Sequence, residues 1–142
     1  MIFCDTSAAA KLYVPEKDSA AVRVMLESED QIFISEFARV ELMSVFHRQL
    51  REKIWSRHQF TTATRQFMND DNNGFWTWLP MSPVIVEAAA RTYATLPDSV
   101  FLRSADCIHL ITAIHHGFTD ICTFDKHQTG AAVALGLSLR RP

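Results

Sequence analysis

The sequence predicts a single α/β domain, a parallel sheet of about five strands with helices on both faces. Its 142 residues fit one ordinary domain, and 48% hydrophobic against 21% charged residues exclude a disordered chain. Short apolar segments rich in β-branched and aromatic residues alternate with helical patterns, which is typical of strands joined by crossover helices. These segments lack an alternation of period two, as expected for strands buried on both faces. We therefore treat residues 1–142 as one domain.

Caps and breakers delimit the elements of the first half. Asp5 and the residues after it form a good helix start, and Pro15 ends that helix. A run of Asn72, Asn73 and Gly74 stops the last helix of this half. The expected elements are a strand over 1–4, helices over 5–14 and 19–29, a strand over 31–35, and helices over 37–53 and 56–71.

The second half repeats the alternation. Pro83 suits the first turn of a helix, Ser104 can cap the next one, and Gly117 can end it. The expected elements are a strand over 75–80, helices over 83–96 and 104–116, a strand over 120–124, a helix over 127–135 and a strand over 137–140.

Composition and the opening residues argue against a basic nucleic-acid coat, a membrane protein and a secreted protein. The net charge of −2 argues against a basic coat for nucleic acid, and no apolar run reaches the roughly 20 residues of a membrane span. The opening MIFCDT has no basic leader before an apolar stretch. The three cysteines, Cys4, Cys107 and Cys122, lack CxxC spacing and have apolar neighbours, which predicts reduced core residues. We expect a cytoplasmic protein without a membrane partner.

One segment is locally basic. Between residues 39 and 65 lie six basic residues and two acidic ones: Arg39, Arg48, Arg51, Lys53, Arg57 and Arg65 against Glu41 and Glu52. Such segments are most often solvated helix faces, and contact with phosphates is the alternative.

Two aspartates follow predicted strands directly. Asp5 comes after the strand over 1–4, and Asp125 follows the strand over 120–124. In an open α/β sheet, ligands gather outside the carboxyl ends of the strands. If both strands are central and parallel, both carboxylates open onto the same edge. The alternative is that each aspartate only caps the helix that follows it.

Two further acids are placed by their helices. Asp106 lies in the first turn of a helix that is apolar nearly all round, so a charge there needs a cation or a metal. An ion pair with Arg103 is the structural alternative. Glu41 shares its helix face with Val45 and Arg48, and periodicity alone favours an exposed position for it.

Several carboxylates at one sheet edge repel each other and need positive charge. Hard oxygen ligands without a set of Cys or His indicate Mg²⁺, with Mn²⁺ as the alternative, and suit phosphodiester or phosphoryl transfer. A zinc site from Asp106 and His109, or from His115 and His116, lacks a third ligand with suitable spacing.

Four short motifs follow one another along the chain: IFCDTSAAAKL at the start, VEL at 40–42, LRSADCIHL at 102–110 and TFDKH at 123–127. In their order and spacing, which cover the whole chain, they resemble the PIN-domain family, and above all the VapC toxins of bacterial type II toxin–antitoxin pairs.

The resemblance implies a metal-dependent endoribonuclease with an acidic cluster at one sheet edge. Carried over to this chain, Asp5, Glu41, Asp106 and Asp125 match the family's catalytic and metal-binding acids, and Thr123 matches a supporting hydroxyl residue. Similar proteins are usually homodimers that cut RNA and are inhibited by a small VapB-like antitoxin. The RNA that is cut, the antitoxin and the number of metal ions do not follow from the sequence.

Two rival interpretations remain. A phosphatase of the HAD-like class also begins with a strand and an aspartate, but it needs a second aspartate two positions later, where this chain has Ser7. The other rival is a non-catalytic α/β interaction module whose acids are caps and surface residues. Only a preformed acidic site should bind Mn²⁺ or Mg²⁺ stoichiometrically.

Asp120 is not assigned to the acidic cluster. It precedes its strand and is expected at the opposite end of the sheet.

Overall fold

The computed structural model describes residues 1–142, with five strands and seven helices. The strands are β1 (Ile2–Cys4), β2 (Ile32–Ser35), β3 (Thr77–Leu79), β4 (Asp120–Ile121) and β5 (Ser138–Leu139). The helices are α1 (Thr6–Ala10), α2 (Ser19–Glu27), α3 (Ala38–Arg51), α4 (Arg57–Asn72), α5 (Pro83–Thr92), α6 (Ser104–His115) and α7 (Lys126–Ala134).

All strand pairings are parallel. Strands β1, β2 and β3 form one sheet in that order, and β4 pairs with β5. A parallel bridge between Cys4 and Cys122 joins the two parts, with the Cys122 N–H 2.9 Å from the Phe3 carbonyl oxygen. The strand order across the molecule is therefore β3-β2-β1-β4-β5, and the expected α/β fold with a parallel sheet is confirmed.

Strand β4 is shorter than the predicted 120–124. Its ladder stops after the Cys122 bridge because the next backbone donors turn to a side chain. The Phe124 N–H donates to the Ser7 hydroxyl at 2.8 Å, and the Asp125 N–H lies 3.2 Å from the same oxygen. The backbone thus leaves the sheet just before Asp125, and this exit turns the chain toward α7.

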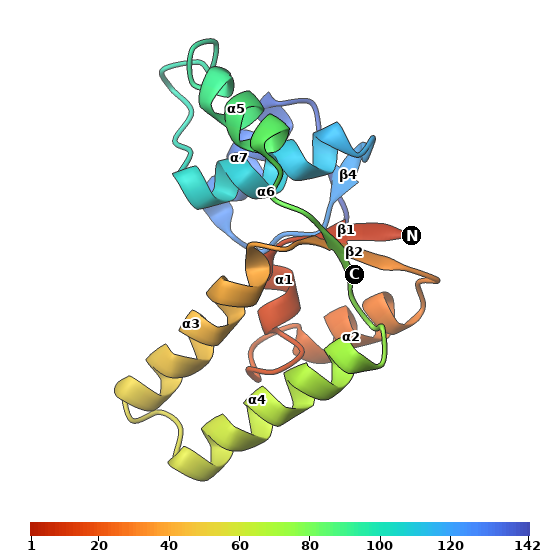
Figure 1. Ribbon diagram of the computed structural model, residues 1–142, viewed down its shortest axis with the longest axis vertical. Coiled ribbons are helices and arrows are strands. Elements are labelled where there is room, and N and C mark those ends of the chain that lie inside the picture. Colours follow the sequence, from red (N-terminus) through yellow and green to blue (C-terminus); the bar gives the residue numbers. More distant parts are fainter.

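Helices cover both faces of the sheet (Figure 1), with α1 to α4 on one side and α5 to α7 on the other. Alternate strand residues enter two separate cores. Ile2 and Cys4 pack with the first group of helices, whereas Phe3 between them packs with the second. This double burial explains why β1 is apolar at every position.

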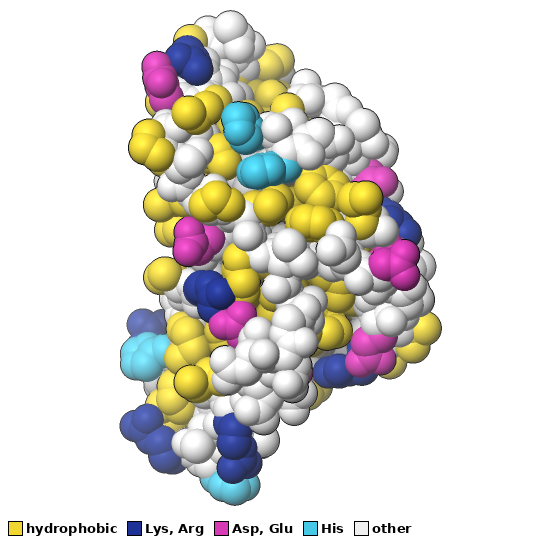
Figure 2. Space-filling model, turned by 45° about the vertical axis from the view of Figure 1, so that its right-hand side comes forward, with side chains coloured by type: hydrophobic (Ala, Val, Ile, Leu, Met, Phe, Trp, Pro, Cys, Tyr) yellow, Lys and Arg dark blue, Asp and Glu magenta, His cyan; other side chains and the backbone are white.

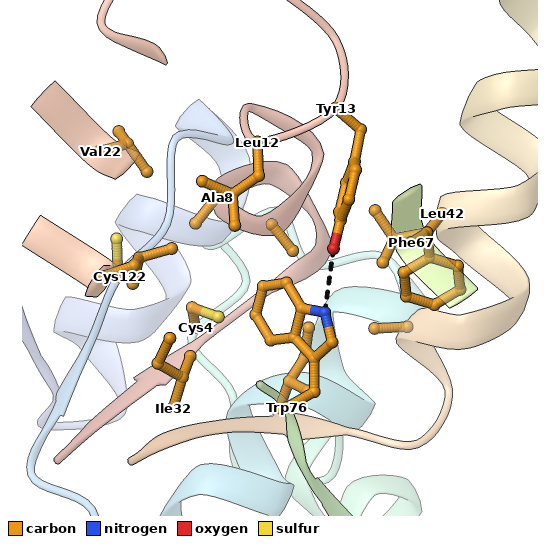
Figure 3. Packing of buried hydrophobic residues seen from close by; sticks show 14 of the residues in the cluster. Cys4, Ala8, Leu12, Tyr13, Val22, Ile32, Leu42, Phe67, Trp76 and Cys122 are labelled. Carbon is orange, nitrogen blue, oxygen red and sulfur yellow. Dashed lines mark hydrogen bonds between the residues drawn. The ribbon is translucent and has the colours of Figure 1, made fainter. Parts of the chain in front are cut away.

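The first core is the more aromatic one. The indole of Trp76 donates a hydrogen bond to the Tyr13 hydroxyl at 3.1 Å (Figure 3), and Tyr13 in turn donates to Asp70 at 2.8 Å. The ring of Phe67 packs edge-on against Tyr13. A buried polar chain of this kind satisfies the indole and phenol groups inside an apolar environment.

The predicted cap at Asp5 is present, since its side chain accepts the Ala8 N–H. Two further helices have side-chain caps: Ser56 forms a capping box with Gln59, and Ser82 caps the helix that begins at Pro83. Ser104 is not a cap: the cap position is Arg103, whose guanidinium has no acceptor atom and so makes no capping bond. The first and fifth helices are shorter than the predicted 5–14 and 83–96, since both give way to turns. None of the seven helices combines the length and the apolar composition that a membrane span requires.

Candidate active site

One cavity of about 640 Å³ collects all four predicted acids, Asp5, Glu41, Asp106 and Asp125. Asp5 follows β1 and Asp125 follows the β4 segment, so both lie at the carboxyl edge of the sheet. Asp106 comes from the first turn of α6, and Glu41 from the first turn of α3. The structure thus brings together residues more than 100 positions apart, as sequence reasoning expected of this edge.

Asp5 is buried, with 1% of its surface exposed, and its carboxylate is held by neutral hydrogen-bond donors. Its carboxylate accepts hydrogen bonds from the Ser7 hydroxyl at 2.7 Å, the Thr123 hydroxyl at 2.7 Å and the Ala8 N–H at 3.0 Å. Burial raises the pKa of Asp5, although the bond from Thr123 and the nearby charge of His109 act in the opposite direction. Asp5 is therefore a cap of α1 and also a buried acid of the cavity.

Asp106 and Asp125 share one cation, Arg103. The Arg103 Nε lies 2.7 Å from one Asp106 oxygen, and Nη2 lies 2.7 Å from Asp125 Oδ2. The other Asp125 oxygen accepts the N–H groups of His127 and Gln128. Burial by itself would raise the pKa of Asp125, but these two bonds and the guanidinium outweigh it and lower the pKa. The pairing of Asp106 with Arg103 that sequence reasoning left open is therefore present.

Glu41 faces the cavity and not bulk solvent. Its Oε2 lies 2.6 Å from Nε2 of His109, a buried residue one helical turn after Asp106, and accepts the Thr6 hydroxyl as well. Burial would raise the pKa of Glu41, but the bond and charge of His109 and the Thr6 hydroxyl lower it overall. Periodicity favoured an exposed Glu41, and this was wrong because the long-range contact with His109 draws the side chain inward.

The donor chemistry of the cavity fits a hard divalent cation such as Mg²⁺ or Mn²⁺. Four carboxylates supply oxygen ligands, and the nearby Ser7 and Thr123 hydroxyls are already committed to Asp5. In this arrangement no three His, Cys, Asp or Glu side chains lie close enough together to hold an ion. The positive charge that balances Asp106 and Asp125 in this structure is the Arg103 guanidinium.

The roles of several polar residues of this cavity, among them Thr6, Ser7 and His109, were not predicted from the sequence. Ser7 was not expected in the site, whereas its hydroxyl links Asp5 to the backbone of Phe124 and Asp125. His109 was considered only as a zinc ligand. The signal for His109 was its place one turn after Asp106 on a helix buried nearly all round, where a histidine needs a polar partner.

The arginines of the basic segment lie in three different settings. Arg39 is paired, since its guanidinium bonds to Asp71 and lies 3.9 Å from the ring centroid of Trp78. Arg48 lines the same cavity as the four acids. Figure 2 shows Lys and Arg side chains gathered at the lower end of the molecule, near the α3–α4 connection. There Arg51 and Arg57 are exposed.

The chain matches the family model of the PIN domain over residues 2–133. Among solved structures it is similar to the Mycobacterium tuberculosis toxin VapC20, which cleaves the sarcin-ricin loop, with 17% identity, a TM-score of 0.75 and full coverage of both chains. It is also similar to FitAcB from Neisseria gonorrhoeae, with 18% identity, a TM-score of 0.74 and coverage of 100% of this chain and 98% of that one.

A third similar structure is a toxin-antitoxin complex from Klebsiella pneumoniae, with 17% identity, a TM-score of 0.66 and coverage of 100% of this chain and 98% of that one. None of the curated proteins matches the sequence. At 17 to 18% identity, these structural similarities show a shared fold.

Proposed function

The chain belongs to the PIN domain family, and on that premise we propose that it is a metal-dependent endoribonuclease, the toxin of a VapBC-type toxin–antitoxin pair. The observation that carries the proposal is the convergence of Asp5, Glu41, Asp106 and Asp125 in one cavity at the carboxyl edge of a parallel sheet. Four acids gathered there are costly for stability, since like charges repel and buried charges lose hydration. A role in binding a cation and a phosphodiester accounts for that arrangement.

We assign Asp5, Asp106 and Asp125 as the residues that hold Mg²⁺ or Mn²⁺, with Glu41 completing the negative charge. A bound divalent ion would supply a more acidic water and neutralise charge on the phosphate. The chain's own part is to orient the acids. Ser7 and Thr123 fix Asp5 through their hydroxyls.

Glu41 is fixed in the same way from the other side of the cavity, by His109 and Thr6. Outer contacts of this kind commonly change metal affinity or activity 10- to 100-fold when they are removed. No side-chain nucleophile is needed for hydrolysis by an oriented water. The Ser7 hydroxyl is bonded to Asp5 and to the backbone, so it is a supporting group here, and the phosphatase interpretation finds no second acid at that position.

The partners we propose are an RNA substrate, a small VapB-like antitoxin and a second copy of the chain. The similarity to a toxin-antitoxin complex supports the antitoxin. We propose that the protein acts in the cytoplasm, where its three buried thiols, Cys4, Cys107 and Cys122, would stay reduced. Burial raises the pKa of all three thiols, that of Cys122 to about 12, so they are unreactive core groups.

The test is cleavage of total cellular RNA by the purified chain, with cleavage sites mapped in Mg²⁺, in Mn²⁺ and in EDTA. We expect metal-dependent cleavage at defined sites by the native chain and none by Asp5→Asn. Asp120→Asn is the matched control, since it removes one aspartate charge at the opposite end of β4. Its cleavage should equal that of the native chain. If the native chain cuts no RNA and binds no Mn²⁺ in a titration, the proposal is wrong and the protein is a non-catalytic module.

A further inference from the structure

Arg103 connects two of the proposed metal ligands, and no other cation in the cavity does so. Besides the bonds from Nε to Asp106 and from Nη2 to Asp125, its Nη2 lies 3.3 Å from the second Asp106 oxygen. The guanidinium therefore engages both oxygens of Asp106 and one of Asp125. These contacts raise the pKa of Arg103, with the hydrogen bond to Asp106 as the leading cause.

The other basic side chains that line the cavity are arranged differently. Lys11 is buried, and its ammonium group is bonded to Glu16 and to the Lys17 carbonyl, away from the four acids. Arg48 lines the cavity from α3 and makes no ion pair. Arg103 therefore differs from Lys11 and Arg48 in that it bonds directly to two of the four acids.

We infer that Arg103 is an internal counter-cation that competes with the divalent metal for Asp106 and Asp125. The inference rests on the proposed function, because it assigns these two carboxylates to a metal. The guanidinium occupies acceptor sites on both oxygens of Asp106 and on one oxygen of Asp125, and it repels a cation placed between them, so an ion that binds these carboxylates competes with Arg103 and favours its displacement. In the metal-free protein the same guanidinium offsets the repulsion between the two carboxylates.

The position of Arg103 makes this displacement feasible. Its side chain is 51% exposed, and it belongs to the cap residue of α6, which has extended backbone geometry and no capping bond of its own. The guanidinium can therefore move into solvent without breaking the helix or leaving a buried donor unpaired. Ion pairs in which the cation is half-exposed are weakened by solvent, which allows a divalent ion with several carboxylate ligands to replace them.

The competition predicts opposite effects of one substitution on metal affinity and on metal-free stability. Arg103→Gln should bind Mn²⁺ about five- to tenfold more tightly than the native chain, as expected when two ion pairs of a half-exposed guanidinium need not be broken first. In EDTA the same variant should melt at a lower temperature, because Asp106 and Asp125 then face each other without a counter-charge. Its rise in melting temperature on adding Mn²⁺ should exceed that of the native chain.

The experiment is Mn²⁺ titration by calorimetry and by electron paramagnetic resonance, with thermal unfolding in EDTA and in saturating Mn²⁺. Arg48→Gln is the matched control: it removes one positive charge from the same cavity but no ion pair with the acids. We expect its Mn²⁺ affinity to change by less than about twofold and its melting temperature in EDTA to stay the same.

The outcomes separate this inference from the proposed function. If native chain and Arg103→Gln bind Mn²⁺ with equal affinity, or the variant binds it more weakly, the competition is overturned while the metal site stands. An equal gain in affinity for Arg48→Gln would also overturn it, since the effect would then be one of net charge. If neither chain binds Mn²⁺, the proposed metal site itself fails. Tighter binding by Arg103→Gln alone supports the competition.

Discussion

Replacing Asp5 with Asn should make the metal-free protein slightly more stable while it abolishes RNA cleavage. The Asp5 carboxylate is 1% exposed and has three neutral donors, the hydroxyls of Ser7 and Thr123 and the N–H of Ala8. Burial raises the pKa of Asp5 in spite of these donors. At neutral pH the charged form therefore costs the folded state free energy that the amide does not.

The size of the effect follows from two opposing contributions. Removing a buried charge recovers a desolvation cost of several kcal/mol. In Asn one acceptor oxygen becomes an NH2 group, so the bonds from Ser7 and Ala8 to the remaining oxygen become neutral and the Thr123 hydroxyl must turn to accept from the NH2 group. Each of the three bonds loses about 1 kcal/mol. Because the raised pKa shows that desolvation is the larger contribution, we expect a net gain of about 1 kcal/mol for Asp5→Asn. For a chain of 142 residues this corresponds to a melting temperature about 3 °C higher.

The assay is thermal unfolding in EDTA as a function of pH. Since the folded pKa of Asp5 lies above its ordinary value of 3.8, the cost of its charge is present above the folded pKa. It disappears as the pH falls through the window between the folded pKa and 3.8. The advantage of Asp5→Asn should therefore be full at pH 8 and absent near pH 3.5. A variant that melts several degrees below the native chain at pH 8, or a difference that is constant with pH, would refute this reasoning. Full metal-dependent RNA cleavage by Asp5→Asn, free of contaminating nuclease, would refute the mechanism.

Two further predictions concern the surroundings of the acids. Exchanging Arg48, Arg51 and Arg57 for Glu should weaken RNA binding and flatten its salt dependence, because contacts with phosphates release counterions. The measurement is filter binding at about 50 to 300 mM KCl. An unchanged affinity would mean that these arginines form a solvated face, or that they serve the dimer or the antitoxin. Replacing His109 with Leu should lower RNA cleavage about 10- to 100-fold by freeing Glu41, with a melting temperature within a few degrees of the native value. Native cleavage rates in that variant would show that Glu41 needs no fixed orientation.

The alternation of strands and helices was predictable because it depends on local patterns. Apolar runs without period two, the Ser56 capping box and Pro83 in the first turn of its helix all act within a few residues. The short β4 was not predictable, because its end is set by the Ser7 hydroxyl more than 100 residues away. Element boundaries that depend on such long-range donors leave no trace in local composition.

The same distinction applies to the candidate site. Asp5 and Asp125 could be placed from strand ends alone, since parallel strands direct their carboxyl ends to one edge. The inward position of Glu41 could not be predicted, because helical periodicity reports only on the helix that carries Glu41. The contact that draws the Glu41 side chain inward comes from His109 on α6. The pairing of Arg103 with Asp106 is local, at a spacing of three residues, but its second bond to Asp125 depends on the fold.

Sequence reasoning treated capping and site membership as alternatives for Asp5 and Asp125, whereas each residue does both. One oxygen of Asp5 accepts the Ala8 N–H and the other accepts the Thr123 hydroxyl. One oxygen of Asp125 accepts the N–H groups that open α7, and the other reaches Arg103. A carboxylate has two acceptor atoms, so one can fix the helix start while the other takes part in the cavity's chemistry. An aspartate at a strand end followed by a helix is therefore held by its cap in a defined orientation. The longer glutamate at either position would lose that bond and with it the orientation.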